Sequence, residues 1–495
     1  MSTPQAGLPR FDNSYARLPE RFHVRQAPAP VAAPRLIRLN RALAEMLGLD
    51  PDARDAGAWA EIFAGNTPLP GSEPLAMAYA GHQFGNFVPQ LGDGRAVLLG
   101  EVVDRDGTRR DLQLKGAGRT PFSRGGDGRA ALGPVLREYV VSEAMYALGI
   151  PTTRALAAVS TGEPVYRETA LPGAVLTRVA ASHIRVGTFQ YFAARGDTEA
   201  IRTLADHVIE RHYPEVAADP APYLVLLRAF ADRQAMLIAR WLGVGFIHGV
   251  MNTDNVSVAG ETIDFGPCAF MDEYHPDTVF SSIDQMGRYA YERQPHIAQW
   301  NLARFAETLL PLLADDQERA VALATEVVSA FSQRFEACWI EVMAGKLGLR
   351  QPCAADGRLV RELLGLMREA EADFTLTFRP LAGVIDTDCA AEDLNTWLPD
   401  SADRDDWLAR WRSRLATEGS LQATATRLRE TNPAYIPRNH RVEQMIEAAV
   451  TRDDFSPFER LLDVLSSPFQ ERPEHAAYGT PPKPHERVTQ TFCGT

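Results

Sequence analysis

Residues 245–266 read GFIHGVMNTDNVSVAGETIDFG, and this stretch decides the fold. His248 stands seven residues before Asn255, and Asp264 opens an Asp-Phe-Gly tripeptide. The part NVSV-AGE-TIDFG predicts a β-hairpin, because two short apolar strands flank a glycine-containing turn. Asn255 would then stand where the first strand begins and Asp264 where the second ends. The sequence therefore predicts that these two side chains lie next to each other.

An amide oxygen beside a carboxylate suits Mg²⁺, with water and phosphate oxygens completing its coordination. Together with His248, the spacing of Asn255 and Asp264 reproduces the order H-x-D-x-x-x-x-N … D-F-G of protein kinases. It predicts an α+β, protein-kinase-like fold of two lobes, with an N-terminal extension and a helical C-terminal extension.

The kinase order lacks one element. Val250 occupies the position of the base, and a valine side chain cannot accept a proton from a hydroxyl group. Asp254, beside Asn255, is the nearest carboxylate. Either the base has moved to another residue, or the reaction differs from ordinary phosphoryl transfer.

The N-terminal half contains a lysine in the context that kinases use to bind phosphates. Residues 96–103 and 110–115 predict two strands, and residues 134–148 predict a helix between Pro134 and Gly149. Lys115 ends the second strand. Either Glu138 or Glu143 on the helix could form an ion pair with it.

Glycines and cations elsewhere in the chain could also contact phosphate. The sequence QLGDGR predicts a tight turn, and the loop at residues 115–133 combines six glycines with three arginines and one lysine. Downstream, Arg178 ends a short apolar run, and Arg185 follows seven residues later. The positions in question are Gly92, Gly94, Arg95, Gly128, Arg178 and Arg185, and Asp127 lies in the same loop beside Gly128.

Length and composition limit the class of protein. The 495 residues include 51 Lys and Arg against 64 Asp and Glu, a formal net charge of −13. That charge disfavours nucleic acid or an anionic membrane as partner. Neither a signal peptide nor a run of about 18 apolar residues is recognisable, and the five cysteines are scattered. These features predict a cytoplasmic protein.

The pattern along the chain predicts four parts. Residues 1–75 form an N-terminal extension with a short helix at 36–47, and residues 76–160 form the first kinase-like lobe. Residues 161–345 form the second lobe, with a helix at 221–242 and the metal-binding loop. Residues 346–495 form a helical extension that ends in a proline-rich tail.

Four stretches in this order make the sequence recognisable. They are YAGHQFGNFVPQLGDGRA, LKGAGRTPFSRGGDGRAALG, GFIHGVMNTDNVSV and DFGPCAFMDEY. Between residues 75 and 300 the chain closely resembles the selenoprotein O (YdiU) family of protein adenylyltransferases. The resemblance implies transfer of AMP from ATP to Ser, Thr or Tyr hydroxyls of proteins, and extends the prediction to UMP from UTP.

The resemblance also implies roles for single residues. Asp254 is the implied proton acceptor, and Asn255 and Asp264 are the implied ligands of Mg²⁺ (or Mn²⁺). A nucleotide bound in a flipped orientation presents its α-phosphate at the reaction centre, which accounts for Val250. The implied nucleotide-binding set is Gly92, Gly94, Arg95, Lys115, Asp127, Gly128, Arg178, Arg185 and Asp264, with Glu138 as the partner of Lys115.

The tail departs from the pattern of the family. Cys493 is third from the end, and Gln490 stands where selenocysteine-containing members have a cysteine. We expect Cys493 to regulate activity through a disulfide, with Cys268 as the candidate partner. Two other functions stay open at this stage: a true kinase acting on a protein or a small molecule, and a non-catalytic nucleotide-binding redox module.

Overall fold

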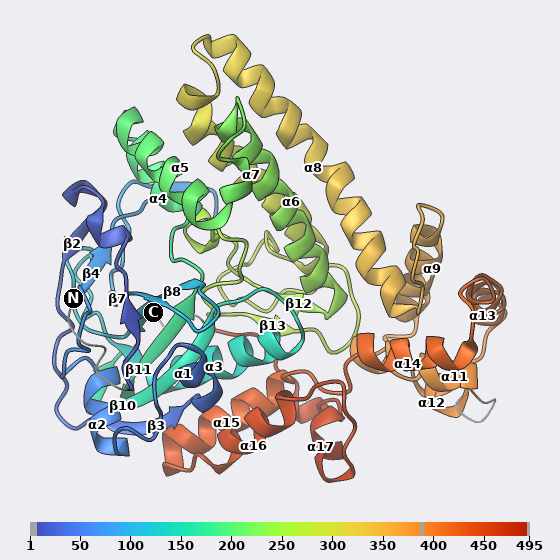
Figure 1. The fold of residues 1–495 in the computed structure, drawn as a ribbon. Coiled ribbons are helices and arrows are strands. Elements are labelled where there is room, and N and C mark those ends of the chain that lie inside the picture. The colour runs from blue at the N-terminus through green and yellow to red at the C-terminus, as the bar shows by residue number, and fades with distance from the viewer. Residues whose placement is uncertain (1–6, 387–390, 493–495) are drawn as a thin grey trace.

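The structure is a computed structural model that describes residues 7–386 and 391–492. It is a mixed α/β structure in which a large antiparallel sheet precedes a mainly helical part (Figure 1). The strand order is β2-β4-β7-β8-β11-β10-β3, with β1 on β7 and β9 on β11. Its strands are β1 (Arg10–Phe11), β2 (His23–Arg25), β3 (Arg35–Leu39), β4 (Leu75–Met77), β7 (Ala96–Val103), β8 (Arg109–Lys115), β9 (Ala130–Ala131), β10 (Arg154–Tyr166) and β11 (Ala170–Ala180).

Helices dominate the chain after β11. Two small antiparallel pairs accompany them, β5 (Gly81–Gln83) with β6 (Asn86–Val88) and β12 (Phe246–Ile247) with β13 (Ala269–Phe270). The helices are α1 (Arg41–Met46), α2 (Ala56–Phe63), α3 (Leu132–Ala147), α4 (Val186–Ala193), α5 (Thr198–His212), α6 (Pro222–Gly243), α7 (Gln294–Leu313), α8 (Gln317–Lys346), α9 (Asp356–Glu369), α10 (Phe374–Phe378), α11 (Leu381–Asp386), α12 (Ala391–Trp397), α13 (Ala402–Leu415), α14 (Leu421–Thr431), α15 (Asn439–Arg452), α16 (Ser456–Leu465) and α17 (Ala476–Gly479).

The strongest local patterns in the sequence are confirmed. β7 and β8 pair antiparallel, from Ala96 opposite Lys115 to Val103 opposite Arg109. The helices expected at 134–148 and 221–242 are α3 and α6. α3 ends where expected because Gly149 adopts a φ of +76°, which favours glycine.

The helix expected at 36–47 is only partly correct. Residues 35–39 form β3, whose backbone pairs with β10 at the edge of the sheet. The helix begins after Asn40, whose side chain accepts a hydrogen bond from the Leu43 amide and caps α1. Pairing with a strand more than a hundred residues away therefore overrides the local helical pattern.

The hairpin expected between Asn255 and Asp264 does not form a pair of strands. Its first arm pairs outward, since the Val258 amide donates to Ile184 O and the Val186 amide donates to Val256 O. In its second arm, the Thr262 amide donates to Pro151 O and Thr262 O accepts from the Thr153 amide. The backbone groups that a hairpin would have paired internally are thus satisfied by two neighbouring segments.

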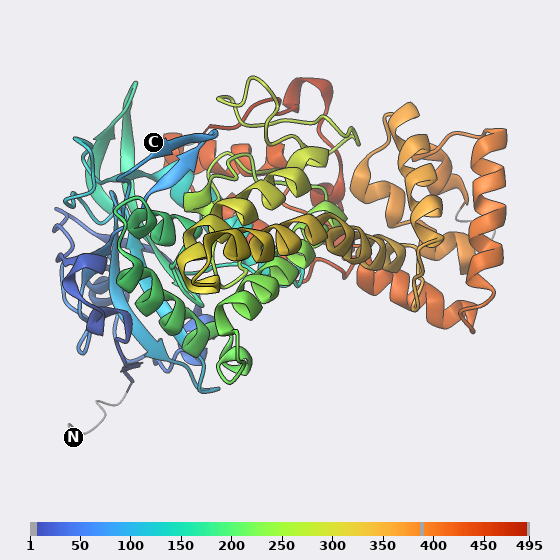
Figure 2. The ribbon, with the colours of Figure 1, turned by 90° about the horizontal axis from the view of Figure 1, so that it is seen from above.

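Two groups of helices lie outside the α4–α8 segment. α3 packs on the sheet, and α15 and α16 pack against α3 through a shared apolar core. α9 and α11–α14 lie on the far side of the molecule from the sheet (Figure 2). No helix in the described part of the chain is both long and apolar enough to cross a membrane.

The domain boundaries at residues 75, 160 and 345 stay a prediction. β1, β2 and β3, from the first 75 residues, belong to the same sheet as the later strands.

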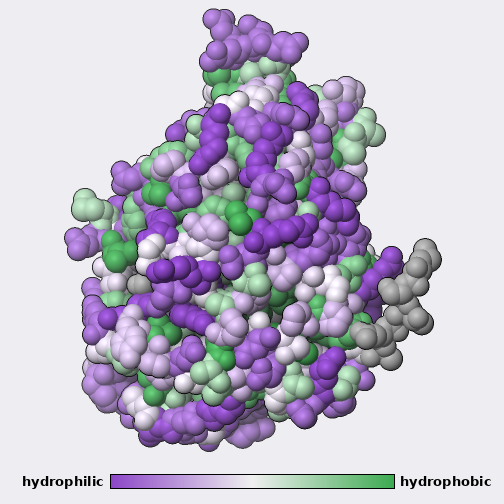
Figure 3. All heavy atoms as spheres, turned by 90° about the vertical axis from the view of Figure 1, so that its left-hand side faces the viewer, coloured by the Kyte–Doolittle hydropathy of each residue, from purple (hydrophilic) through white to green (hydrophobic). Residues whose placement is uncertain are grey.

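The face on the sheet side of the molecule is mostly hydrophilic, with small separate hydrophobic areas (Figure 3). This face is therefore suited to contact with water.

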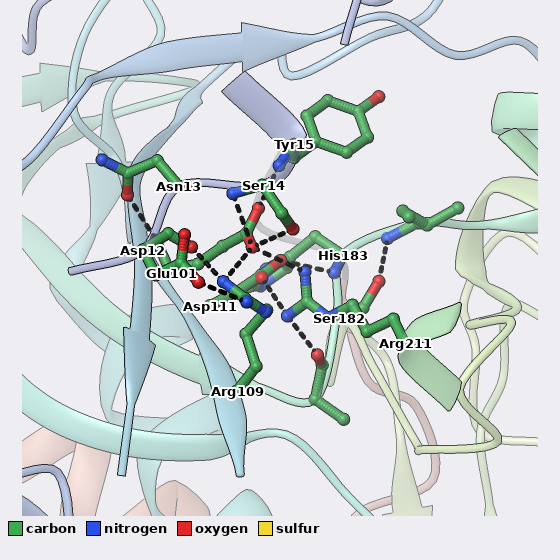
Figure 4. Close-up of polar contacts among 12 residues, drawn as sticks. Asp12, Asn13, Ser14, Tyr15, Glu101, Arg109, Asp111, Ser182, His183 and Arg211 are labelled. Atoms are coloured by element: carbon green, nitrogen blue, oxygen red, sulfur yellow. Dashed lines mark hydrogen bonds and ion pairs between the residues drawn. The ribbon is translucent and has the colours of Figure 1, made fainter. Parts of the chain in front are cut away.

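A buried charge network joins the sheet to α5 (Figure 4). Arg211 on α5 lies 2.5 Å from the Asp111 carboxylate and 3.4 Å from that of Glu101. Asp111 also accepts hydrogen bonds from the backbone and ring nitrogens of His183. Glu101 and Asp111 are both almost fully buried, so their charges depend on these partners.

Replacement of Arg211 by methionine should strongly destabilise the fold. Arg211→Met leaves two buried carboxylates without their shared cation, which costs roughly 3–5 kcal/mol. The exposed pair of Arg228 with Glu326 provides the control, since Arg228→Met should change the free energy of unfolding by less than about 1 kcal/mol. Urea titration measures both values, and equal losses would contradict the importance of the network.

Candidate functional site

One cavity, with a volume of about 860 Å³, gathers almost all the residues that the sequence singled out. It lies between strands of the large sheet and the segment that contains residues 250–267. Glu138 does not line it but contacts two residues that do. The predicted residues in its lining are Gly92, Gly94, Arg95, Lys115, Asp127, Gly128, Arg178, Arg185, Asp254, Asn255 and Asp264.

The wall of the cavity holds a cluster of three cations and two carboxylates. Lys115 Nζ lies 2.5 Å from Glu138 Oε2, and Arg178 pairs with the other oxygen of Glu138. Arg178 and Lys115 both contact Asp264 Oδ1, while Arg185 Nη1 lies 2.9 Å from Asp264 Oδ2. The cluster carries one more positive than negative charge, which favours an anionic ligand.

The structure selects Glu138 as the partner of Lys115. The alternative, Glu143, instead binds the Arg154 guanidinium at 2.6 and 2.8 Å. β8 supplies the lysine and α3 supplies Glu138, so the pair links the sheet to the helix that packs on it.

The neighbouring charges determine the ionisation of the cluster. Burial raises the pKa of Asp264, but Arg178, Arg185 and Lys115 outweigh this effect and hold the pKa well below its usual range. Burial also lowers the pKa of Lys115, and Arg178 adds to that lowering. Asp264 is therefore ionised at neutral pH and provides the negative charge around which the cations gather.

Arg185 reaches the cluster because of the outward pairing of residues 256–258. That pairing places Arg185 at the start of α4, where its Nη1 donates to Asp254 O at 2.7 Å. Asp254 itself lies in the short 3₁₀ turn Thr253–Asn255. Burial raises the pKa of Asp254 to about 6, despite the opposing effect of Arg185. A carboxylate in this state can accept a proton near neutral pH.

The glycine-rich segments pack against one another at the cavity. A Cβ atom on Gly92 would lie 2.3 Å from the Phe122 ring, and one on Gly128 would lie 2.1 Å from Gly118 O. Ser123 and Thr120 add hydrogen bonds from the loop to Gly94 O and Asp93 O. The glycines therefore allow the loop at residues 115–133 to fold onto the turn at Gly92–Gly94.

Asp127 lies at the rim of the cavity. Its carboxylate accepts hydrogen bonds from Arg167 Nη1 at 2.8 Å and from the Arg129 amide at 2.9 Å. Sequence reasoning missed Arg167, which directly follows β10. It also missed several aromatic and polar residues of the lining, of which the first three stand in the stretch YAGHQFG: Tyr79, Gln83, Phe84, Phe122 and Tyr166.

The side-chain oxygens of Asn255 and Asp264 suit one hard cation, such as Mg²⁺, that is also coordinated by oxygens from outside the chain. Asn255 Nδ2 donates to Val250 O at 3.0 Å, which leaves the amide oxygen as the ligating atom. Asp264 adds an ionised carboxylate in the same cavity. Within residues 7–386 and 391–492, no group of three or more His, Cys, Asp or Glu side chains could hold a metal. A cation here would therefore need oxygens from a ligand or water.

The predicted disulfide between Cys268 and Cys493 is not tested, because Cys493 lies outside the described residues. Cys268 is buried, and burial raises the pKa of its thiol to about 12. A thiol in this state is a poor nucleophile for disulfide exchange. Nearby, Thr491 packs against the segment after Asp264, and its hydroxyl donates to Pro267 O at 2.5 Å.

The chain is similar to known proteins over almost its whole length. The sequence model of a family described as protein adenylyltransferase SelO matches residues 8–466. Protein nucleotidyltransferase YdiU of Rhizobium rhizogenes is 64% identical over 491 residues, 98% of this chain and 97% of the relative. The proteins of the same name from Rhodopseudomonas palustris and Rhizobium meliloti are each 63% identical, over 98% of this chain and 99% of their own length.

The site and these matches define the class of protein, a nucleotidyltransferase. The chain belongs to the SelO family.

Proposed function

We propose that this protein transfers AMP from ATP to Ser, Thr or Tyr hydroxyls of other proteins. The name of the family and of the relatives supports protein nucleotidyl transfer. The observation that carries the proposal is the position of Asp254 in the same cavity as Lys115, Arg178 and Arg185, with Val250 also in the lining. Asp254 is a proton acceptor near phosphate-binding cations, but it does not occupy the kinase base position, which is Val250. This arrangement suits attack by a hydroxyl group on a phosphate other than the terminal one.

The fold that we propose is the two-lobed fold of protein kinases. The ion pair between Lys115 on β8 and Glu138 on α3 supports it, as does Asp264 in an Asp-Phe-Gly tripeptide. In this arrangement the sheet and α3 form one lobe, and the helices from α4 to α8 form the other.

Each group of side chains has a role in this reaction. Lys115, Arg178 and Arg185 bind and orient the triphosphate, and Asn255 and Asp264 would hold Mg²⁺ (or Mn²⁺). When bound, the metal ion supplies positive charge that offsets the charge of the phosphate oxygens. The glycine-rich loop covers the cavity and reduces access of water.

The transfer forms one bond to the α-phosphorus and breaks another. The hydroxyl oxygen of the acceptor forms a bond to the α-phosphorus of ATP, and its proton passes to a carboxylate oxygen of Asp254. The bond between the α-phosphorus and the oxygen that bridges to the β-phosphorus breaks. Pyrophosphate leaves with the electron pair, so the acceptor protein carries AMP.

Labelled ATP tests the proposed function. With ³²P at the α position, we expect label on this protein or on a protein acceptor, and with ³²P at the γ position we expect none. The reason is that pyrophosphate carries the γ-phosphorus away. Transfer of γ-label alone would instead establish a kinase. Tight binding of ATP without transfer of either label would establish a non-catalytic module.

Replacement of Asp264 tests the metal site. Asp264→Asn removes the ionised ligand and the anion shared by three cations, so Mg²⁺ should no longer strengthen the binding of ATP. Calorimetric titration of ATP with and without Mg²⁺ measures this effect. The exposed Asp106, on the turn between β7 and β8, supplies the control variant Asp106→Asn. An undiminished effect of Mg²⁺ in Asp264→Asn would contradict the assignment.

Replacement of Asp254 separates the proton acceptor from nucleotide binding. Asp254→Asn should lower kcat by roughly 10²–10⁴-fold, the usual contribution of a general base. The Kd for ATP should change little, because among the described residues the carboxylate forms no ion pair or hydrogen bond with Lys115, Arg178 or Arg185. Single-turnover transfer of α-label and equilibrium binding measure the two quantities. A kcat within about twofold of the wild-type value would exclude Asp254 as the base.

A further inference from the structure

The β5–β6 hairpin lies directly on the turn that carries Asp254. The His82 amide donates to Thr253 Oγ1 at 2.7 Å, and the Phe84 amide donates to Asn252 Oδ1 at 3.0 Å. Alternate backbone amides of the hairpin thus bind the two residues that precede Asp254. Because Gln83 lies between these amides, its side chain has a fixed position relative to the Asp254 carboxylate.

Both oxygens of the Asp254 carboxylate are close to the hairpin. Gln83 Nε2 donates to Asp254 Oδ2 at 3.3 Å. A Cβ atom on Gly81 would lie 2.4 Å from Asp254 Oδ1, so the missing side chain of Gly81 provides the space for this oxygen. Asp254 Oδ1 is buried and has no hydrogen-bond partner among the residues that the structure describes. The hairpin therefore fixes the orientation of the carboxylate at both oxygens, by a hydrogen bond at Oδ2 and by close packing at Oδ1.

The surroundings hold the hairpin and the Asp254 turn together. Thr253 Oγ1 donates to Gln190 Oε1 at 2.6 Å, and the amide of Gln190 contacts His82 Nδ1 at 2.9 Å. On the other side, the Tyr289 hydroxyl donates to Asn252 Oδ1 at 2.7 Å. These bonds come from α4 and from the segment before α7, so the position of Gln83 does not depend on the hairpin alone.

We propose that Gln83 is a positioning residue for the transfer reaction, whose side-chain amide binds Asp254 Oδ2 and orients the carboxylate for the acceptor hydroxyl. This inference rests on the proposed function. It adds that the hairpin forms the acceptor side of the cavity, since Gln83 and Phe84 both line it. Gly81 has a second role here, because any larger residue would displace the carboxylate.

The variant Gln83→Met tests the hydrogen bond, because methionine has a similar length and no amide. We expect kcat for α-label transfer to fall by roughly tenfold or more, the effect of losing a hydrogen bond to a charged group. KM for ATP and the melting temperature should stay at wild-type values. Gln422→Met, at an exposed position of α14, is the matched control and should leave kcat unchanged.

The variant Gly81→Ala tests the same inference independently. The φ of Gly81 lies outside the left-handed region, so alanine causes no backbone strain there and acts by displacing the Asp254 side chain, whose Oδ1, Cβ and Cγ atoms would lie 2.4, 2.9 and 2.9 Å from the new Cβ. It should also lower kcat while preserving the Kd for ATP.

Two results would overturn the inference. One is a kcat of Gln83→Met within about twofold of wild type. The other is a fall in kcat that is matched by losses of ATP affinity and melting temperature, which indicates a structural role alone. A wild-type protein that binds ATP but transfers no α-label contradicts the proposed function, and this inference with it.

Discussion

The carboxylate of Asp264 is the interaction on which the rest of the site depends. Three cations from three separate segments meet on it: Lys115 from β8, Arg178 from β11 and Arg185 from the start of α4. Buried cations so close together would repel one another without a shared anion. Glu138 balances part of the remaining charge, and the cluster keeps a surplus of one positive charge, which favours binding of a triphosphate.

Elements far from the cavity hold these cations in place. Arg185 follows the turn at residues 181–184, and His183 in that turn is bound to Asp111 in the buried network with Arg211. The same segment pairs with residues 256–258. The network on α5, the turn and the Asp254 loop therefore form one continuous set of contacts. Disruption of the network should therefore displace Arg185 and so disturb the site.

Part of the site could be predicted from local patterns, whereas the roles of Asp254, Arg178 and Arg185 were implied by the resemblance to the family. The strand ending in Lys115, the helix carrying Glu138 and the Asp-Phe-Gly tripeptide each follow short patterns that the structure keeps. The hairpin after Asn255 and the helix at residue 36 could not be predicted correctly, since residues distant in sequence satisfy those backbones: residues 151–153 and 184–186 in the first case and β10 in the second. Gln83 was missed for the same reason, because its partner Asp254 lies 171 residues away.

A crystal structure with a non-hydrolysable ATP analogue tests the central claim most directly. In this analogue, a methylene group replaces the oxygen that bridges the α- and β-phosphorus. The account predicts that the phosphates contact Lys115, Arg178 and Arg185, and that the α-phosphate is the one nearest to Asp254. A complex in which the γ-phosphate lies beside Asp254, with the α-phosphate far from it, would contradict the account.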